Sequence, residues 1–147
     1  MAAIAEFLSD SEKKEIAHAI AEAESHTSGE IRVYIERKCK GDEKKRAIKI
    51  FHQLKMHRTI FHTGVLVYIA HEDRAFAIIG DRGIHEKVPE NFWDDVKELM
   101  KNHFVEGKFA EGISKAIKLC GEHLKKHFPS DGHNPDELSN EVVIGKN

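Results

Sequence analysis

The chain has 147 residues, of which 40% are hydrophobic and 33% charged, and its formal net charge is -2. This length suits one domain with a core of ordinary size. No run approaches the roughly 18 apolar residues needed to span a bilayer, and residues 1–10 lack the basic start and apolar stretch of a secretory signal. We therefore expect a soluble, cytoplasmic protein with no membrane span. The near-neutral charge also excludes a strongly basic nucleic-acid binder.

The first half of the chain predicts a helix, a strand and a second helix. Ser9 and Glu12 form a capping-box signature that begins a helix over about residues 9–25. Residues 30–36 alternate strictly between polar and apolar types, which is typical of a strand with one buried face. Residues 43–57 carry apolar side chains at helical spacing and predict the second helix.

The second half predicts a hairpin followed by two helices. Residues 64–70 and 75–80 are apolar runs separated by a short polar turn, as in two buried antiparallel strands. Pro89 is expected to open the third helix, because proline is well tolerated at the first helical position. Residues 109–124 place apolar side chains on one face of a last helix.

The predicted order is therefore α-β-α-β-β-α-α, with the first two strands parallel through a right-handed crossover. Helices on both faces of a small mixed sheet give a three-layer α/β/α sandwich. We expect residues 1–129 to form this single domain. The polar residues 130–147 are expected to form a loosely held C-terminal tail that touches the body through Leu138 and Val142.

This topology brings three glycine-containing turns to one edge of the sheet. The first two strands begin there, at residues 28–30 and 63–64, and the antiparallel third strand ends there, at residues 80–83. Glu30 and Asp81 would then converge, and carboxylates are the ligands that calcium and magnesium prefer. Such a site could also activate a water for phosphoester hydrolysis. The alternative is that these glycines only serve the turns and these acids only serve solubility.

Asp94 and Asp95 are weaker candidate ligands for the same cation. They fall in the first turns of the predicted third helix, where acidic residues complement the helix dipole without any ion. No catalytic residue can be assigned, because neither the C-x5-R nor the D-x-D-x-T/V signature of known phosphatases occurs.

Three other features have a simpler interpretation. His123 and His127 have metal-binding spacing, but no zincin glutamate follows and a solvated helix face is favoured. Cys39 and Cys120 show no metal or redox spacing, and Cys120 should pack as a small hydrophobe.

Residues 37–58 hold nine basic and two acidic side chains. This segment could meet phosphates, yet it has no interleaved aromatic residues, so nucleic-acid binding is disfavoured.

Ordered segments along the chain resemble the TPM-domain family, named for thylakoid-lumen phosphatase-like, photosystem II repair and acetylcholine-receptor modulator proteins. The segments are Thr27–Ile31, Thr63–Leu66 and Ile79–Ile84, followed by Val88–Trp93 and Phe128–Pro129. The resemblance covers about residues 9–128. It is closest to a short, stand-alone bacterial branch with a polar Asp-Glu-Leu tail, matched here by residues 136–138.

The resemblance implies an α/β/α sandwich, binding of a divalent metal (often calcium) by acidic residues, and weak acid-phosphatase activity in some members. The third-strand turn is Gly-Asp-Arg-Gly here instead of the frequent Gly-Tyr-Gly. Arg82 could orient a phosphate or pair with a carboxylate. Two functions are thus expected as alternatives: a calcium- or magnesium-binding domain with weak metal-dependent phosphomonoesterase activity, or a non-catalytic adaptor domain, with an unknown protein partner, in which the metal only stabilises the fold.

Overall fold

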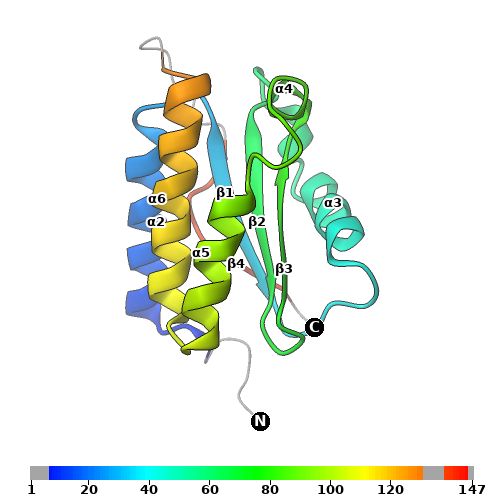
Figure 1. Ribbon diagram of the computed structural model, residues 1–147, viewed down its shortest axis with the longest axis vertical. Coiled ribbons are helices and arrows are strands. Elements are labelled where there is room, and N and C mark those ends of the chain that lie inside the picture. Colours follow the sequence, from blue (N-terminus) through cyan, green and yellow to red (C-terminus); the bar gives the residue numbers. More distant parts are fainter. Residues whose placement is uncertain (1–6, 131–137, 146–147) are drawn as a thin grey trace.

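The computed structural model describes residues 7–130 and 138–145, which form three layers (Figure 1). The helical segments are α2 (Asp10–Glu24), α3 (Glu43–Gln53), η1 (Met56–Arg58), α4 (Arg82–His85), α5 (Asp94–Val105) and α6 (Phe109–His127). The strands are β1 (Glu30–Glu36), β2 (Gly64–Ala70), β3 (Ala75–Gly80) and β4 (Val143–Ile144). The α/β/α sandwich expected from the sequence is confirmed.

The sheet has the strand order β3-β2-β1-β4. β1 and β2 are parallel, with Glu30 opposite Gly64, and β2 and β3 form the predicted antiparallel hairpin. β2 is therefore a central strand, and all of its residues are buried. This burial on both faces explains why its sequence is a continuous apolar run instead of an alternating one.

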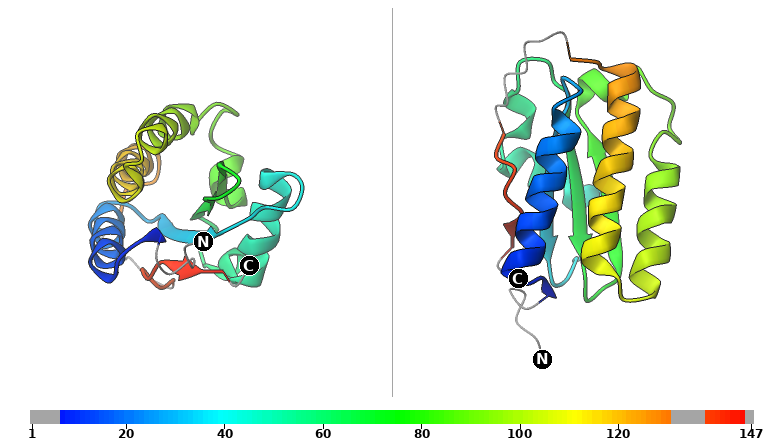
Figure 2. Two further views of the ribbon diagram at one scale, coloured as in Figure 1. Left: turned by 90° about the horizontal axis from the view of Figure 1, so that it is seen from below. Right: turned by 90° about the vertical axis from the view of Figure 1, so that its left-hand side faces the viewer.

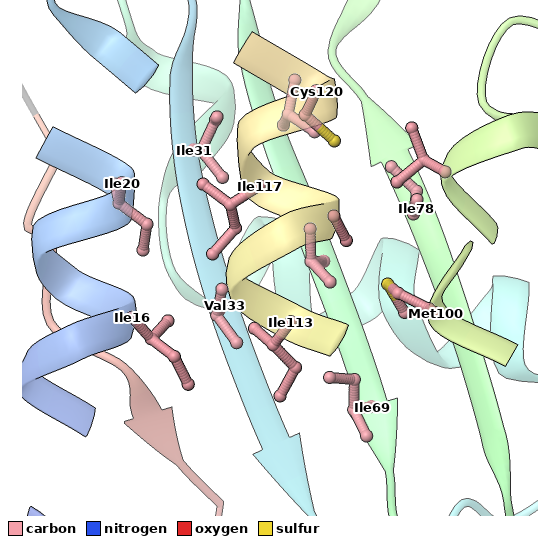
Figure 3. Close-up of a cluster of buried hydrophobic side chains, with 14 of the residues drawn as sticks. Ile16, Ile20, Ile31, Val33, Ile69, Ile78, Met100, Ile113, Ile117 and Cys120 are labelled. Atoms are coloured by element: carbon pink, nitrogen blue, oxygen red, sulfur yellow. The ribbon is translucent and has the colours of Figure 1, made fainter. Parts of the chain in front are cut away.

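Helices α2, α5 and α6 cover one face of the sheet and α3 covers the other (Figure 2). Alternation along β1 sorts its side chains between two cores, because successive residues point to opposite faces. Val33 packs with the three-helix layer, whereas Tyr34 packs with α3. Figure 3 shows part of the larger core, where Ile16 and Ile20 of α2 lie beside Ile113 and Ile117 of α6.

The first two helices begin as predicted. Ser9 caps α2, and its side chain and that of Glu12 form the reciprocal capping box. Helix α3 ends at Gln53 instead of His57, because Lys55 adopts a left-handed conformation with φ 58° before the short η1 turn. In the described ranges no helix combines the length and the apolar character that crossing a bilayer requires.

The prediction that Pro89 opens the third helix is wrong. Residues 89–93 form turns, and α5 begins only at Asp94. The fixed φ of proline suits a turn as well as a first helical position, so the pattern could not separate the two. The sequence also gave no indication of the one-turn helix α4, which Asp81 caps.

Part of the expected tail belongs to the sheet. Val143 and Ile144 form β4, which pairs in parallel with Tyr34 and Ile35 of β1. The expected contacts of Leu138 and Val142 are confirmed, since both pack against the hydrophobic cores. Residues 136 and 137 of the Asp-Glu-Leu match lie outside the described residues.

Candidate functional site

The sheet edge predicted from topology is present. Glu30 and Asp81 flank Gly64: Glu30 is its register partner on β1, and the amide of Asp81 donates to the Gly64 carbonyl at 2.8 Å. Two strand spacings therefore separate the two acidic residues, or about 10 Å between Cα atoms. Gly64 places no side chain between them.

Hydrogen bonds join the three turns at this edge. The Thr63 hydroxyl donates to the Ser28 carbonyl at 3.0 Å, and the Gly83 amide donates to the His62 carbonyl at 2.9 Å. A Cβ atom at Gly83 would lie 2.5 Å from the His62 carbonyl oxygen and 2.6 Å from that of Phe61. Only glycine fits there, so the second glycine of the Gly-Asp-Arg-Gly turn holds the two loops together.

Asp81 is 9% exposed, and its two carboxylate oxygens have different surroundings. Oδ1 accepts a hydrogen bond from the Arg82 amide at 2.7 Å and so caps α4. Oδ2 is shielded from solvent and accepts no hydrogen bond from the described residues. The nearest polar atom opposite it is Nδ1 of His62, at 3.4 Å, which is longer than an ordinary hydrogen bond and forms none with Oδ2.

The ring of His62 connects Asp81 to Arg82. The Arg82 guanidinium lies 2.8 Å from His62 Nε2. Arginine only donates, so Nε2 must accept and the ring proton must be on Nδ1, facing Asp81. His62 was not among the residues predicted from the sequence, because a lone histidine in a polar turn carries no periodic or spacing signal. Pairing with a carboxylate was one of the two roles expected for Arg82. Within the described residues, the guanidinium contacts His62 and forms no ion pair with a carboxylate.

Glu30 is 2% exposed and holds the C-terminal segment. Its Oε1 atom accepts a hydrogen bond from the Leu138 amide at 2.7 Å. A second buried carboxylate, Glu24 at the end of α2, accepts from the Ile31 amide at 2.8 Å. Glu24 was not predicted from the sequence, although it follows Ile16 and Ile20 at helical spacing and therefore falls on the buried face of α2.

Asp94 and Asp95 take part in other contacts. Asp94 is 64% exposed and pairs with Lys97 within α5 at 3.6 Å. Asp95 reaches His123 of α6 at 2.7 Å, so this histidine links two helices instead of only facing solvent. In residues 7–130 and 138–145, no three histidine, cysteine or acidic side chains are grouped closely enough to hold a metal ion.

The site opens onto a groove of about 830 Å³. The groove follows β3 between α3 and the segment from α4 to α5, and Asp81 and Arg82 line one end of it. The outer edge of β3 pairs with no strand in the described parts of the chain. A solute in the groove could therefore reach the Asp81 end directly.

A different buried polar cluster lies at the opposite end of β1. Glu36 is fully buried, accepts two hydrogen bonds from Arg46 of α3 at 2.8 and 2.9 Å, and accepts another from Tyr68 of β2. The bonds to Glu36 raise the pKa of Arg46, and burial together with Glu36 raises the pKa of Tyr68. Arg46 and Tyr68 thus donate to both carboxylate oxygens of Glu36, which makes Glu36 a structural residue.

The basic segment 37–58 is partly neutralised. Arg46 pairs with Glu36, and Arg37 pairs with Glu72 at 2.6 Å. Two of the arginines that could have met phosphates are thus already engaged.

The fold and its edge define the class of the protein: a small α/β/α domain in which glycine turns position a partly unsatisfied carboxylate at the end of a mixed sheet. Comparison with protein families then shows that the chain belongs to the TPM-domain family, whose model matches residues 2–123. No curated protein matches it significantly.

Two solved structures are similar to this chain. One is the NMR structure of the BA42 protein from the psychrophilic bacterium Bizionia argentinensis, at 42% identity and a TM-score of 0.91, covering 99% of this chain and all of that one. The other is the N-terminal domain of the cg2496 protein from Corynebacterium glutamicum, with a TM-score of 0.64 over 95% of this chain and 81% of that one. At 13% identity the second similarity shows a shared fold only.

Proposed function

We propose that this TPM domain binds a divalent cation, calcium or magnesium, at the sheet edge, with Asp81 as the principal ligand. The observation that carries the proposal is the Oδ2 atom of Asp81, which is buried and accepts no hydrogen bond from the described residues. Buried carboxylate oxygens are normally paired, because removing their charge from water without a partner is costly. A cation at this oxygen would supply the missing partner.

The donor set fits a hydrated cation better than a closed protein cage. Magnesium commonly keeps several waters and binds through one or two carboxylates, and calcium tolerates irregular oxygen sets. Asp81 supplies one oxygen that accepts no hydrogen bond from the described residues, and Glu30, across Gly64, is the second candidate. Thr63 and Gly83 contribute indirectly, because their hydrogen bonds hold the turns that carry these acids.

We propose further that the bound cation supports a weak phosphomonoesterase activity. Arg82 is exposed at the groove, next to Asp81, where a guanidinium could hold a phosphate oxygen. A divalent cation at Asp81 would polarise the same phosphate and lower the pKa of a bound water. The alternative remains an adaptor domain in which the cation only stabilises the fold.

The metal site is tested by titrating magnesium or calcium and following amide chemical shifts. Asp81→Asn removes the charge but keeps a good helix cap for α4. We expect shifts in the wild type at residues 29–30, 64 and 80–83, and their loss in Asp81→Asn. Glu30→Gln should weaken binding while retaining an acceptor for the Leu138 amide. Asp10→Asn, at a residue 96% exposed in the first turn of α2, is the matched control and should bind normally.

Shifts confined to other regions, or unchanged binding in Asp81→Asn, would contradict the site. Metal binding should also raise the melting temperature, since a ligand at one hundred times its Kd stabilises the folded state by about 2.7 kcal/mol.

Turnover of p-nitrophenyl phosphate separates the enzyme from the adaptor domain. An enzyme should lose turnover in Asp81→Asn and in Arg82→Gln, whereas an adaptor shows stabilisation by metal and the same background rate in all variants.

A further inference from the structure

A second cavity lies at the other end of the sheet, away from Asp81. It measures about 360 Å³ and lies between the β2–β3 hairpin and the turn that joins α5 to α6. Figure 1 shows these two turns side by side at the lower end of the molecule. This volume falls within the range of small-molecule sites. The apolar part of its wall consists of Ile69, Ala70, Ala75, Phe76, Phe104, Val105 and Phe109.

Aromatic contacts hold the apolar wall in place. The ring of Phe104 meets Phe76 edge-on at 5.8 Å between centroids and lies 5.3 Å from Phe109. Phe109 in turn contacts Phe7 at 4.7 Å. Val105, at the rim, is 80% exposed. The apolar wall therefore continues to the surface through Val105, and a solute entering the cavity would bury apolar area there.

Two cations, Arg74 and Lys101, also line the cavity, and no carboxylate does. Both are exposed, and neither forms an ion pair within the described residues. The acids of the hairpin turn are engaged elsewhere: Glu72 pairs with Arg37 at 2.6 Å, and Asp73 accepts a hydrogen bond from the Cys39 amide at 2.7 Å. The cavity mouth is therefore positively charged.

His71 adds an unsatisfied polar atom to the same wall. Its Nε2 atom is shielded from solvent and has no hydrogen-bond partner within the described residues, and its ring stacks on Phe7 at 4.2 Å. Burial lowers the pKa of this ring, so the positive charge at the mouth comes from Arg74 and Lys101. A ligand oxygen entering the cavity would give Nε2 a partner.

We propose that this cavity binds small amphiphilic anions: a carboxylate on an aliphatic or aromatic body of roughly six to ten carbon atoms. The body fills the phenylalanine-lined cavity, and the carboxylate meets Arg74 and Lys101 at the mouth. A neutral ligand would leave the two cations unused, and a simple anion would leave the apolar wall in water. The site is separate from the Asp81 edge and does not depend on the proposed metal.

Octanoate is the probe, with octanol as the neutral match and acetate as the anion without a tail. Binding is measured by calorimetry and by amide chemical shifts on the full chain. We expect octanoate to bind more tightly than octanol, acetate to bind negligibly, and the shifts to gather at residues 69–76 and 101–109. Shifts spread over the surface, or equal binding of octanoate and octanol, would overturn the proposal.

Two variants separate the charge from the apolar wall. The double variant Arg74→Gln with Lys101→Gln should weaken octanoate binding on the order of tenfold, the combined effect of two exposed charge contacts, and leave octanol binding unchanged. Val105→Ser should weaken both ligands. Lys118→Gln, at an exposed lysine of α6 outside the cavity, should change neither. Unchanged octanoate binding in the double variant would rule out recognition of the anion.

Discussion

Buried carboxylates in this chain have different tasks that their residue type does not reveal. Glu24 and Glu30 accept backbone amides, and Glu36 accepts an arginine and a tyrosine. Among these four, only Asp81 has a solvent-shielded carboxylate oxygen that accepts no hydrogen bond from the described residues. Glu30 and Asp81 were predicted together from the sequence. Only the hydrogen-bond pattern shows that Glu24, Glu30 and Glu36 are held by protein donors, whereas one oxygen of Asp81 is not.

Replacing Glu36 tests the structural role assigned to its cluster. Glu36→Gln leaves Arg46 without its buried counter-charge, and breaking a buried ion pair typically costs about 3 kcal/mol. We expect a loss of this size in urea unfolding. Glu72→Gln breaks the comparable Arg37 pair, which is about one quarter exposed on each side, and should cost less than about 1 kcal/mol. Equal losses in the two variants would show that burial is not the deciding factor.

The two cysteines should differ in reactivity. Cys120 is fully buried, and burial raises the pKa of its thiol to about 12, so the reactive thiolate is scarce at neutral pH. Cys39 is only partly buried. A thiol reagent such as Ellman's should therefore label one cysteine in the native protein and both in urea. Cys39→Ser should abolish the native reaction, and a native reaction that persists in this variant would contradict the assignment.

Elements with a strong internal pattern were predicted with accurate bounds. The ranges expected for the first three strands are those of β1, β2 and β3, because apolar alternation or a buried apolar run marks each end. β4 was missed, because it has only two residues and is a strand through pairing with β1, not through its own pattern. The start of α5 was misplaced for a related reason: Pro89 is compatible with both a turn and a helix start.

The contact between α2 and α6 depends on a glycine within a helix. A Cβ atom at Gly121 would lie 2.7 Å from Cβ of Ala23 and 3.1 Å from its Cα atom. Gly121→Val should therefore push the helices apart and destabilise the protein by roughly 1–3 kcal/mol, as overpacked cores do. Lys118→Val introduces the same β-branched side chain at an exposed position of α6 and controls for helix propensity. Urea unfolding that shows similar losses for both would contradict close helix packing here.

At the scale of the whole molecule, topology predicted where a site could lie but not its complete composition. Parallel and antiparallel pairing alone brought Glu30, Gly64 and the turn after β3 to one edge. The position of His62 and the shape of the cavity between the hairpin and α5 depend on the conformations that loops and side chains adopt once the layers are packed. These features join segments distant in sequence, so no local pattern encodes them.

The pH dependence of stability should carry a contribution from His71. Burial lowers the pKa of this ring from its ordinary value of 6.5 in the folded protein. The unfolded chain is then protonated first as the pH falls, so stability is complete above about pH 6.5 and declines as the pH drops toward the folded pKa. Glu72 also has a lowered pKa, but from an ordinary value of 4.5, so its contribution is lost at lower pH.

Urea unfolding at pH 7.5 and pH 5.5 measures the effect of His71. His71→Phe keeps an aromatic ring against Phe7 but cannot be protonated. The other histidines are the same in both proteins, so their contributions cancel in the comparison. We expect the wild type to lose more stability between the two pH values than His71→Phe does. An equal loss would show that His71 is as easily protonated in the folded protein as in the unfolded chain. The positive charge at the cavity mouth could then not be assigned to Arg74 and Lys101 alone.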